Sequence, residues 1–535
     1  MKDKKKLVCS LIVLLVICSL MLPLPTAVAE ASPATEIRDW YDLHAVRDNL
    51  SGGYLLMNDL DATVAGYEEL AGEAAHEGQG WQPIGIYSQD SFDPFIGTFD
   101  GQGYEIRDFF IDRPDVVGVG LFGVVAGVGD GGVIEDVGVV NARVSGDVGV
   151  GGLVGLSAGN VSNSYCIANV TGGSRVGGLV GFNAGSGTVD DCHSSGNVTG
   201  HDILVGGVIG YNMGMVSNSY SGAGVTGDGG VGGLVGGNEG TVRNSYASGD
   251  VTGEWWNIGG VVGHNWDGIV ANCYASGNVS GGSRVGGLVG YNDLYATVAR
   301  SYANGSVNGD DLVGGLVGYN RDTISGCYAL GSVTGNSSVG GLVGGNDDIV
   351  ENSFWDREAS GVETSDGGAG KTAAAMRDIA TFLAVAWDIT AVAHGETDDG
   401  YFWNIVDGET YAFLSAKQFI TYDLTISSTA GGSVTVPGEG VYTYLAGEVV
   451  DLAVEAEELH RFGNWTGEVD TIARVTSGQT TITMDGNYSI TANFEEIQPA
   501  ANWPLIGLII GVVVVVGLFV YAPLRRKIKQ VRRSR

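Results

Sequence analysis

Carboxylates are the most abundant side chains in this sequence that could take part in chemistry. Asp and Glu number 61 against 27 Lys and Arg, which gives a formal net charge of −34. Adjacent acids at Asp190/Asp191, Asp310/Asp311 and Asp347/Asp348 supply the oxygen ligands that Ca²⁺ prefers. These pairs do not follow the glycine-rich nonapeptide of calcium-binding repeats. We therefore favour solvated acidic turns, with weak Ca²⁺ binding by these turns as the alternative.

Gly370-Lys371-Thr372 has the ending of a phosphate-binding loop. Such a loop requires a glycine five residues before Gly370, and Ser365 stands there. Residues 358–370 are polar and glycine-rich, so no apolar strand leads into the segment. The sequence therefore predicts neither a nucleotide site nor a cofactor.

Motifs for catalysis are missing from the sequence. A glycoside-cleaving enzyme needs paired carboxylates across one groove, and a lyase needs a positioned base. The 7 histidines are scattered, and neither His-Glu-any-any-His nor Gly-any-Ser-any-Gly occurs. We predict no catalytic, cofactor-binding or metal-binding residues and no enzyme activity. The alternative is an extracellular polysaccharide lyase or hydrolase built on a β-helix.

A repeat of about 27 residues extends from Val116 to Trp355 and must position any functional group there. Each unit holds short runs of β-forming residues between Gly, Asn and Ser clusters, and no 3.6-residue apolar period persists. We predict an all-β parallel β-solenoid of about 8–9 coils, because stacked units of this length complete one another's sheets. A Gly-Gly-apolar-apolar-Gly core begins at Gly151, Gly177, Gly206, Gly232, Gly259, Gly286, Gly314 and Gly340.

Two side-chain columns recur at fixed places in the repeat. Stacked asparagine amides can hydrogen-bond from coil to coil. A column of flat rings is either a platform for sugars or a packing ladder, and we favour the ladder. The asparagines are Asn183, Asn212, Asn238, Asn265, Asn292, Asn320 and Asn346. The rings are Tyr165, His193, Tyr220, Tyr246, Tyr274, Tyr302, Tyr328 and Phe354.

Four cysteines lie in the repeat region, and a secreted chain could oxidise them. Cys192, Cys273 and Cys327 share one slot, and the nearest two are two coils apart, roughly 9.6 Å by strand spacing. A disulfide requires Cα atoms within about 7 Å. Cys166 is expected to point to the opposite face from Cys192. We predict free thiols.

The units at 176–183, Val-Gly-Gly-Leu-Val-Gly-Phe-Asn, and at 242–253, Val-Arg-Asn-Ser-Tyr-Ala-Ser-Gly-Asp-Val-Thr-Gly, resemble GLUG-motif repeats. The resemblance covers roughly residues 40 to 420 and recurs at least eight times. It implies a bacterial or archaeal cell-surface protein of the adhesin-like kind.

Residues 421–496 read as a separate small β domain, with short apolar strands between Gly and Pro turns. The segments Gly432-Ser-Val, Ala446-Gly-Glu-Val-Val450, Phe462-Gly-Asn-Trp-Thr-Gly467 and Ala492-Asn-Phe494 resemble the divergent internalin-type B repeat of bacterial surface proteins. That resemblance implies a spacer or adhesion module.

Both ends of the chain carry membrane-related signals. Residues 1–29 combine four lysines, an apolar stretch and Ala27-Val28-Ala29, which predicts a cleaved secretory signal. Residues 503–523 are apolar and long enough to cross a bilayer, and the tail 524–535 is basic, which predicts a cytoplasmic C-terminus.

The predicted organisation assigns 30–115 to an N-terminal cap, 116–355 to the solenoid and 356–420 to a C-terminal cap containing a short helix, Thr372–Leu383. We expect a single-pass membrane protein with its N-terminal part outside the cell, adhesin-like or structural in the envelope. Expected partners are the membrane and an extracellular ligand, a glycan or another surface protein. Nucleic acid is excluded by the acidic charge.

Overall fold

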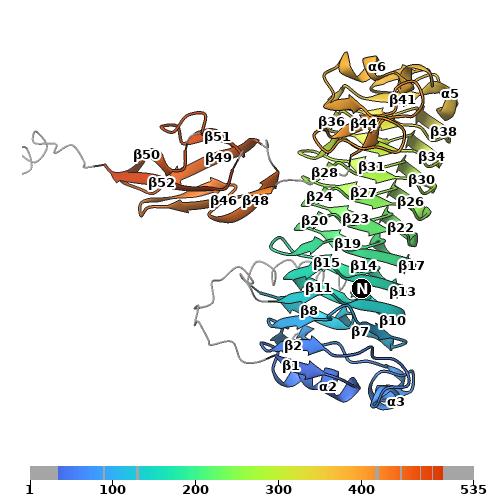
Figure 1. Cartoon of the computed structure of the whole chain (residues 1–535), viewed down its shortest axis with the longest axis vertical. Coiled ribbons are helices and arrows are strands. Elements are labelled where there is room, and N and C mark those ends of the chain that lie inside the picture. Colours follow the sequence, from blue (N-terminus) through green and yellow to red (C-terminus); the bar gives the residue numbers. More distant parts are fainter. Residues whose placement is uncertain are drawn as a thin grey trace, which may run out of the picture. The chain divides into compact units, whose positions relative to one another are not determined.

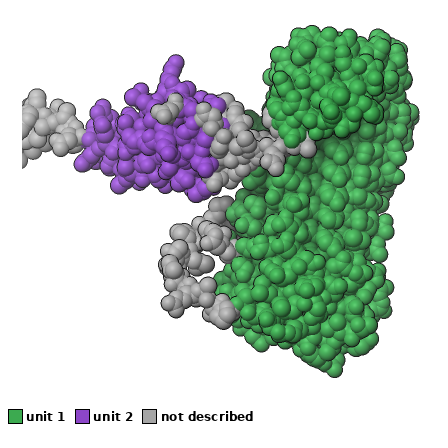
Figure 2. All heavy atoms as spheres, in the orientation of Figure 1, with its two compact units in different colours: residues 1–417 green, residues 418–535 purple. Residues whose placement is uncertain are grey.

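The computed structural model describes residues 34–87, 91–127, 132–415, 421–445, 449–469, 471–484 and 486–497. The chain forms two compact units that divide between residues 417 and 418 (Figure 2). Within the described residues, no helix has the length and apolar character needed to cross a membrane. The predicted signal 1–29, the predicted membrane helix 503–523 and the tail 524–535 lie outside the described residues.

The first unit is a parallel β-solenoid of about nine turns, as predicted (Figure 1). One coil comprises β26 Val251–Gly259, β27 Val262–Asn265, β28 Ile269–Ala271 and β29 Tyr274–Ala275. Each strand pairs in parallel with its equivalents in the coils before and after it. The repeats therefore complete one another's sheets.

Three sheets run along the solenoid. A 12-stranded sheet contains β1 Thr35–Ile37, β2 Gly53–Leu56, β5 Thr98–Asp100, β9 Val133–Glu135, β12 Asn160–Ser162, β16 Thr188–Asp190, β20 Met215–Ser217, β24 Thr241–Arg243, β28, β32 Thr297–Ala299, β36 Thr323–Ser325 and β40 Val350–Glu351. A 9-stranded sheet contains β8 Phe122–Ala126, β11 Val154–Ala158, β15 Val180–Asn183, β19 Ile209–Asn212, β23 Val235–Asn238, β27, β31 Val289–Asn292, β35 Val317–Asn320 and β39 Val343–Asn346.

The third sheet carries the longest strands and the ring column. It contains β6 Glu105–Arg107, β7 Phe110–Val119, β10 Gly138–Gly151, β13 Tyr165–Gly172, β14 Ser174–Gly177, β17 His193–Gly200, β18 Ile203–Gly206, β21 Tyr220–Ser221, β22 Gly224–Gly232, β25 Tyr246–Ala247, β26, β29, β30 Val279–Gly286, β33 Tyr302–Ala303, β34 Val307–Gly314, β37 Tyr328–Ala329, β38 Val333–Gly340, β41 Phe354–Asp356 and β42 Ala369–Lys371. The short strands β3 Ile86–Tyr87 and β4 Phe92–Asp93 form an antiparallel pair at its N-terminal end.

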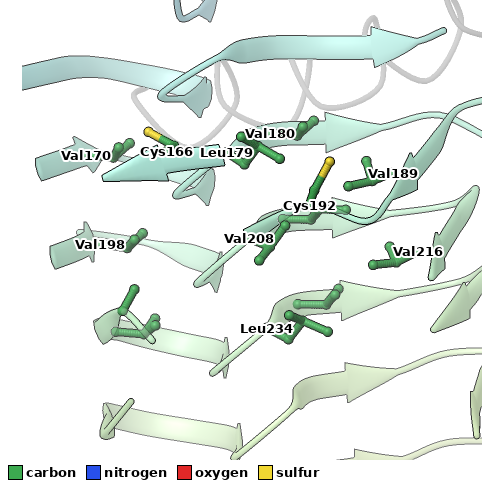
Figure 3. Packing of buried hydrophobic residues seen from close by; sticks show 14 of the residues in the cluster. Cys166, Val170, Leu179, Val180, Val189, Cys192, Val198, Val208, Val216 and Leu234 are labelled. Atoms are coloured by element: carbon green, nitrogen blue, oxygen red, sulfur yellow. The ribbon is translucent and has the colours of Figure 1, made fainter. Parts of the chain in front are cut away.

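The core consists of columns of small apolar residues stacked in register. Val225, Val251, Val279, Val307 and Val333 occupy one such column. Figure 3 shows the inward side chains of neighbouring coils, mostly Val and Leu. Burial of this repeated apolar surface is the main force that holds the coils together.

The three glycines of the repeated core occupy a corner where backbones meet at very short range. A Cβ on Gly259 would lie 2.0 Å from the Val262 carbonyl oxygen, and one on Gly260 would lie 2.1 Å from that of Gly287. A Cβ on Gly263 would lie 2.5 Å from the Val231 nitrogen. Every one of these neighbours is backbone, so no side chain can turn aside. The Gly-Gly-apolar-apolar-Gly pattern is therefore a packing requirement.

A second corner explains the asparagine that stands two residues before the ring in several repeats. Asn163, Asn218, Asn244, Asn272 and Asn352 have φ values of 47°, 51°, 53°, 55° and 50°. This left-handed region is strained for most residues, and asparagine tolerates it best after glycine. The turn that leads into each ring is thus encoded by one residue per coil.

The N-terminal segment stacks on the same solenoid. β1, β2 and β5 pair in parallel and in register with one another and with β9. The helix α2 Trp40–Ala45 follows β1, and Asp39 caps it by accepting from two backbone amides. It continues into a 3₁₀ turn, η1 Val46–Asp48. Two further short helices, α3 Tyr67–Leu70 and α4 Ala75–Gly78, follow.

The segment after Trp355 lies at the C-terminal end of the solenoid (Figure 1). Its apolar side chains pack on the last rings of the column. The predicted helix Thr372–Leu383 is wrong as one helix, because Asp378 interrupts it with extended backbone and caps a new start. It consists of η2 Ala375–Arg377 and α6 Ile379–Leu383, while Thr372 accepts from the Ala375 amide at 3.2 Å. The other elements here are α5 Arg357–Ser360, β43 Ile389–Ala391, β44 Trp403–Ile405 and β45 Phe413–Leu414.

The second unit has two sheets around a separate core. The 4-stranded sheet has the order β48 Gly440–Leu445, β46 Thr421–Ser428, β52 Tyr488–Glu496 and β50 His460–Gly467. The 3-stranded sheet has the order β47 Gly432–Val436, β49 Val449–Ala456 and β51 Gln479–Thr483. Trp465 is the largest fully buried side chain between them.

Candidate functional site

The ring column forms a continuous stack along the third sheet. From Tyr165 to Tyr328, successive rings have centroids 4.7–5.1 Å apart and planes within 2–9° of parallel. Because the rings face one another along the solenoid, each inner ring has both faces covered. A sugar platform needs open ring faces. The rings from Tyr165 to Tyr302 are half-buried and Tyr328 is buried, and this geometry favours the packing ladder.

Both ends of the stack are covered by the chain itself. At the N-terminal end the Tyr165 ring lies against Gly138, since a Cβ added to Gly138 would come within 2.5 Å of the tyrosine Cζ. The Tyr165 hydroxyl donates a hydrogen bond to Glu105. At the other end Trp403 packs on Tyr302 and Tyr328, with centroids 6.0 and 5.6 Å away. Tyr328 donates a hydrogen bond to the Ala412 carbonyl, and burial raises its pKa well above the usual value.

The asparagine column is a hydrogen-bonded ladder buried at one corner of the solenoid. Each side-chain amide donates from Nδ2 to the Oδ1 of the next asparagine, over 2.7–2.9 Å. Each Nδ2 also donates to a carbonyl in the adjoining turn, as Asn238 does to Gly240 at 2.9 Å. The six asparagines of the ladder from Asn183 to Asn320 are fully buried. The ladder therefore satisfies polar groups that burial would otherwise penalise.

His264 belongs to a polar cluster that the sequence did not reveal. Its Nδ1 lies 3.1 Å from Asn257 Nδ2 and its Nε2 lies 3.4 Å from Asp293 Oδ2. Asp293 Oδ1 accepts from the Tyr291 hydroxyl at 2.9 Å and from Arg321 Nη1 at 3.0 Å. The one available signal was a histidine in a column where neighbouring coils carry Tyr or Gly.

The His264–Asp293 pair is arranged as a packing group rather than as a base. Burial lowers the pKa of His264 to about 4, so the ring is neutral at pH 7. The amide of Asn257 donates to Nδ1, which leaves Nε2–H to donate to Asp293. A general base must reach a substrate proton. Both nitrogens are already bonded and the side chain is 7% exposed, so neither is open to a substrate.

The acidic pairs lie in separate coils and serve coil-to-coil contacts. Asp190 accepts from Ser217 Oγ at 2.6 Å and from Asn218 Nδ2 at 2.8 Å. Asp310 accepts from Asn336 Nδ2 at 2.9 Å. Among the described residues, no three His, Cys, Asp or Glu side chains come together as metal ligands. The acidic pairs named as the alternative Ca²⁺ ligands therefore do not come together in one group within the described residues.

Gly370-Lys371-Thr372 lies at the end of a strand rather than in a phosphate loop. β42 Ala369–Lys371 pairs in parallel with β41 Phe354–Asp356, and Lys371 Nζ lies 5.1 Å over the Phe354 ring. The lysine is therefore placed against an aromatic side chain of the C-terminal cap.

All four cysteines of the solenoid are free and buried. The expectation that Cys166 faces away from Cys192 is wrong, since both side chains point into the core (Figure 3). Cys166 pairs in register with Ser194, which lies two residues after Cys192. Residues two apart on a strand share a face. The positions immediately before and after each ring therefore both point into the core.

The thiols are expected to be unreactive in the folded protein. Burial raises the pKa of Cys166, Cys192, Cys273 and Cys327 to about 12, and only the thiolate attacks a disulfide reagent. At pH 8 we expect no reaction with Ellman's reagent in native protein and release of thionitrobenzoate from all four in 6 M guanidinium. Fast labelling of the native protein would contradict the buried positions.

Comparison with known families finds a repeated motif in the first unit and one domain in the second. Residues 172–199, 227–252, 256–280, 281–308 and 309–334 each match the GLUG motif. Residues 422–498 match the divergent InlB B-repeat domain.

Two named proteins share part of the sequence. Halomucin of Haloquadratum walsbyi is 32% identical over 126 residues, which are 23% of this chain and 1% of halomucin. A protein of Evansella cellulosilytica, named as a Gly-rich membrane protein, is 35% identical over 120 residues, which are 22% of this chain and 12% of that protein. The chain therefore matches only a small part of either relative.

Two solved structures have a distant likeness. An immunoglobulin A1 protease from Bacteroides ovatus, so titled, has 19% identity and a TM-score of 0.32 over 66% of this chain and 87% of that one. A structure titled IgA1 protease has 15% identity and a TM-score of 0.29 over 68% of this chain and 25% of that one. Neither likeness is close enough to support a function. The chain carries GLUG-motif repeats in its solenoid and a divergent InlB B-repeat domain after it.

Proposed function

We propose that this chain is a non-catalytic cell-surface protein whose solenoid is a rigid structural element of the envelope. The observation that carries the proposal is the use of repeated side chains for contact between coils. Rings cover rings, asparagines bond to asparagines, and acids bond to the amides of the next coil. Side chains engaged in this way stiffen a rod and leave few groups for chemistry.

The relatives and the charge support a location outside the cell. One relative is named halomucin and the other as a membrane protein. A formal net charge of −34 keeps an exposed rod soluble and repels other acidic surfaces. The predicted signal 1–29 and membrane helix 503–523 would hold residues 30–502 outside. Protease treatment of intact cells should therefore remove the solenoid and spare the basic tail.

An adhesin that binds a glycan or another surface protein is the second version of this proposal. The edges and hydroxyls of the half-buried Tyr220, Tyr246 and Tyr274 are the surface that it would use. They offer hydrogen bonds of the kind that sugars accept, although the ring faces are covered.

A glycan array with the purified full-length chain separates the two versions. For a structural element we expect no spot above the signal of the Tyr246→Phe variant, because that change removes one hydroxyl and retains the ring stack. A glycan signal that falls by half or more in Tyr246→Phe would instead establish the adhesin. Release of reducing ends from any arrayed polysaccharide would contradict both versions and support the lyase or hydrolase.

A further inference from the structure

The N-terminal end of the solenoid contains a half-buried arginine whose donors are only partly used. Arg47, in η1, lies with its guanidinium 4.4 Å over the Trp81 ring, and its Nη1 donates to the His44 carbonyl at 3.0 Å. Its Nε and Nη2 are buried and have no hydrogen-bond partner among the described residues. The neighbouring His44 Nδ1 is also buried and unpartnered in this part of the chain.

The charge of Arg47 is not balanced by a close acid. No Asp or Glu of the described residues forms an ion pair with it, although the sequence contains 61 acids. The second nearby cation, Arg113, has donors already engaged with the Trp81 carbonyl at 3.0 Å, Gln79 Oε1 at 2.8 Å and the Gly80 carbonyl at 3.2 Å. Burial is the main cause that lowers the pKa of Arg47 to about 9, and the positive charge of Arg113 lowers it further. The negative charge of Asp48 acts in the opposite direction.

The two unpartnered nitrogens form one edge of the guanidinium plane. Nε–H and an N–H of Nη2 point in parallel along that edge, which is the arrangement that holds an anion through two hydrogen bonds. Buried donors in proteins are nearly always bonded, and buried charges are nearly always paired. An acidic chain that leaves this edge without a carboxylate has a site for an anion from solution.

We propose that the side edge of Arg47, beside His44 and Trp81, binds an inorganic anion such as chloride. A water molecule would satisfy the two donors but would leave the positive charge of Arg47 without an ion-pair partner.

Bromide, which replaces chloride and scatters anomalously, tests the site directly. Crystals of the full-length chain grown in sodium bromide should show an anomalous peak within hydrogen-bond distance of Arg47 Nε and Nη2. In solution, replacing chloride with gluconate at constant sodium should lower the Tm of the solenoid by about 2 °C, because a bound ligand stabilises the folded state.

Arg47→Lys keeps the positive charge and removes the planar edge, so its Tm should be the same in chloride and gluconate. The matched control is Arg38→Lys, since Arg38 is exposed and paired with Glu36, and this variant should keep the native chloride dependence. Should Arg47→Lys fail to fold, the bromide map of the native chain decides alone. An empty or water-filled edge in bromide, or an equal native Tm in both salts, overturns the proposal.

Discussion

Replacing Asn238 with leucine is expected to destabilise the solenoid by about 4 kcal/mol, because it leaves two buried amide groups without their partners at about 1–3 kcal/mol each. Asn238 accepts from Asn212 and donates to Asn265, both over 2.8 Å. Leucine has nearly the same size, so the loss is polar rather than steric. Urea unfolding followed by far-UV circular dichroism measures the change.

Asn346→Leu is the matched control at the exposed end of the same ladder. Asn346 accepts from Asn320 at 2.7 Å, but its side chain is only partly buried and no further asparagine follows it. Water can replace the lost bonds there, so we expect a cost of about 1 kcal/mol or less. Equal losses at Asn238 and Asn346 would show that burial of the amides does not set their contribution.

Gly260→Ala is expected to cost about 4 kcal/mol, at the upper end of what overpacking does in a protein core. The added Cβ would lie 2.1 Å from the Gly287 carbonyl oxygen and 2.6 Å from the Ala275 Cβ. Relief requires the backbone of the next coil to move, which breaks the register of three sheets at once. The measurement is the midpoint of urea unfolding, with the yield of folded protein as a second readout.

Gly224→Ala tests whether that cost comes from the corner or from glycine in general. A Cβ at Gly224 would meet only Asn197 Oδ1, at an ordinary 3.6 Å. We expect a change within about 0.5 kcal/mol, as for substitutions away from packed sites. A large loss at Gly224 would contradict the assignment of the repeated glycines to close backbone approach.

The period of the sequence was sufficient to predict the solenoid. Gly-Gly-apolar-apolar-Gly, the asparagine column and the ring column recur every 26 to 29 residues, and each now pairs in register with its equivalents. The direction of the ring column did not follow from the period. Small residues flank the rings from Tyr165 to Tyr328 on both sides, so the pattern left open which face points inward. The burial of these flanking residues, Cys166 and Cys192 among them, decides it.

Local signals failed where long-range packing decides the structure. The segment from Thr372 to Leu383 has good helix-forming residues, yet Asp378 starts a second helix there. His264 and Arg47 belong to clusters assembled from residues in different coils or loops, and no short motif marks them. β1, β2 and β5 join the 12-stranded sheet although the long insertions between them hide the repeat.

The asparagine ladder also has a polarity. All six amide bonds point the same way, so their dipoles add along the axis, as peptide dipoles do in a helix. The negative end is Asn183 Oδ1, which is buried and accepts no hydrogen bond from the described residues, while the positive end at Asn346 reaches solvent. Growth of such a protein by gene duplication is therefore directional. A new coil extends the asparagine ladder only when its asparagine donates and accepts in the same direction as the others.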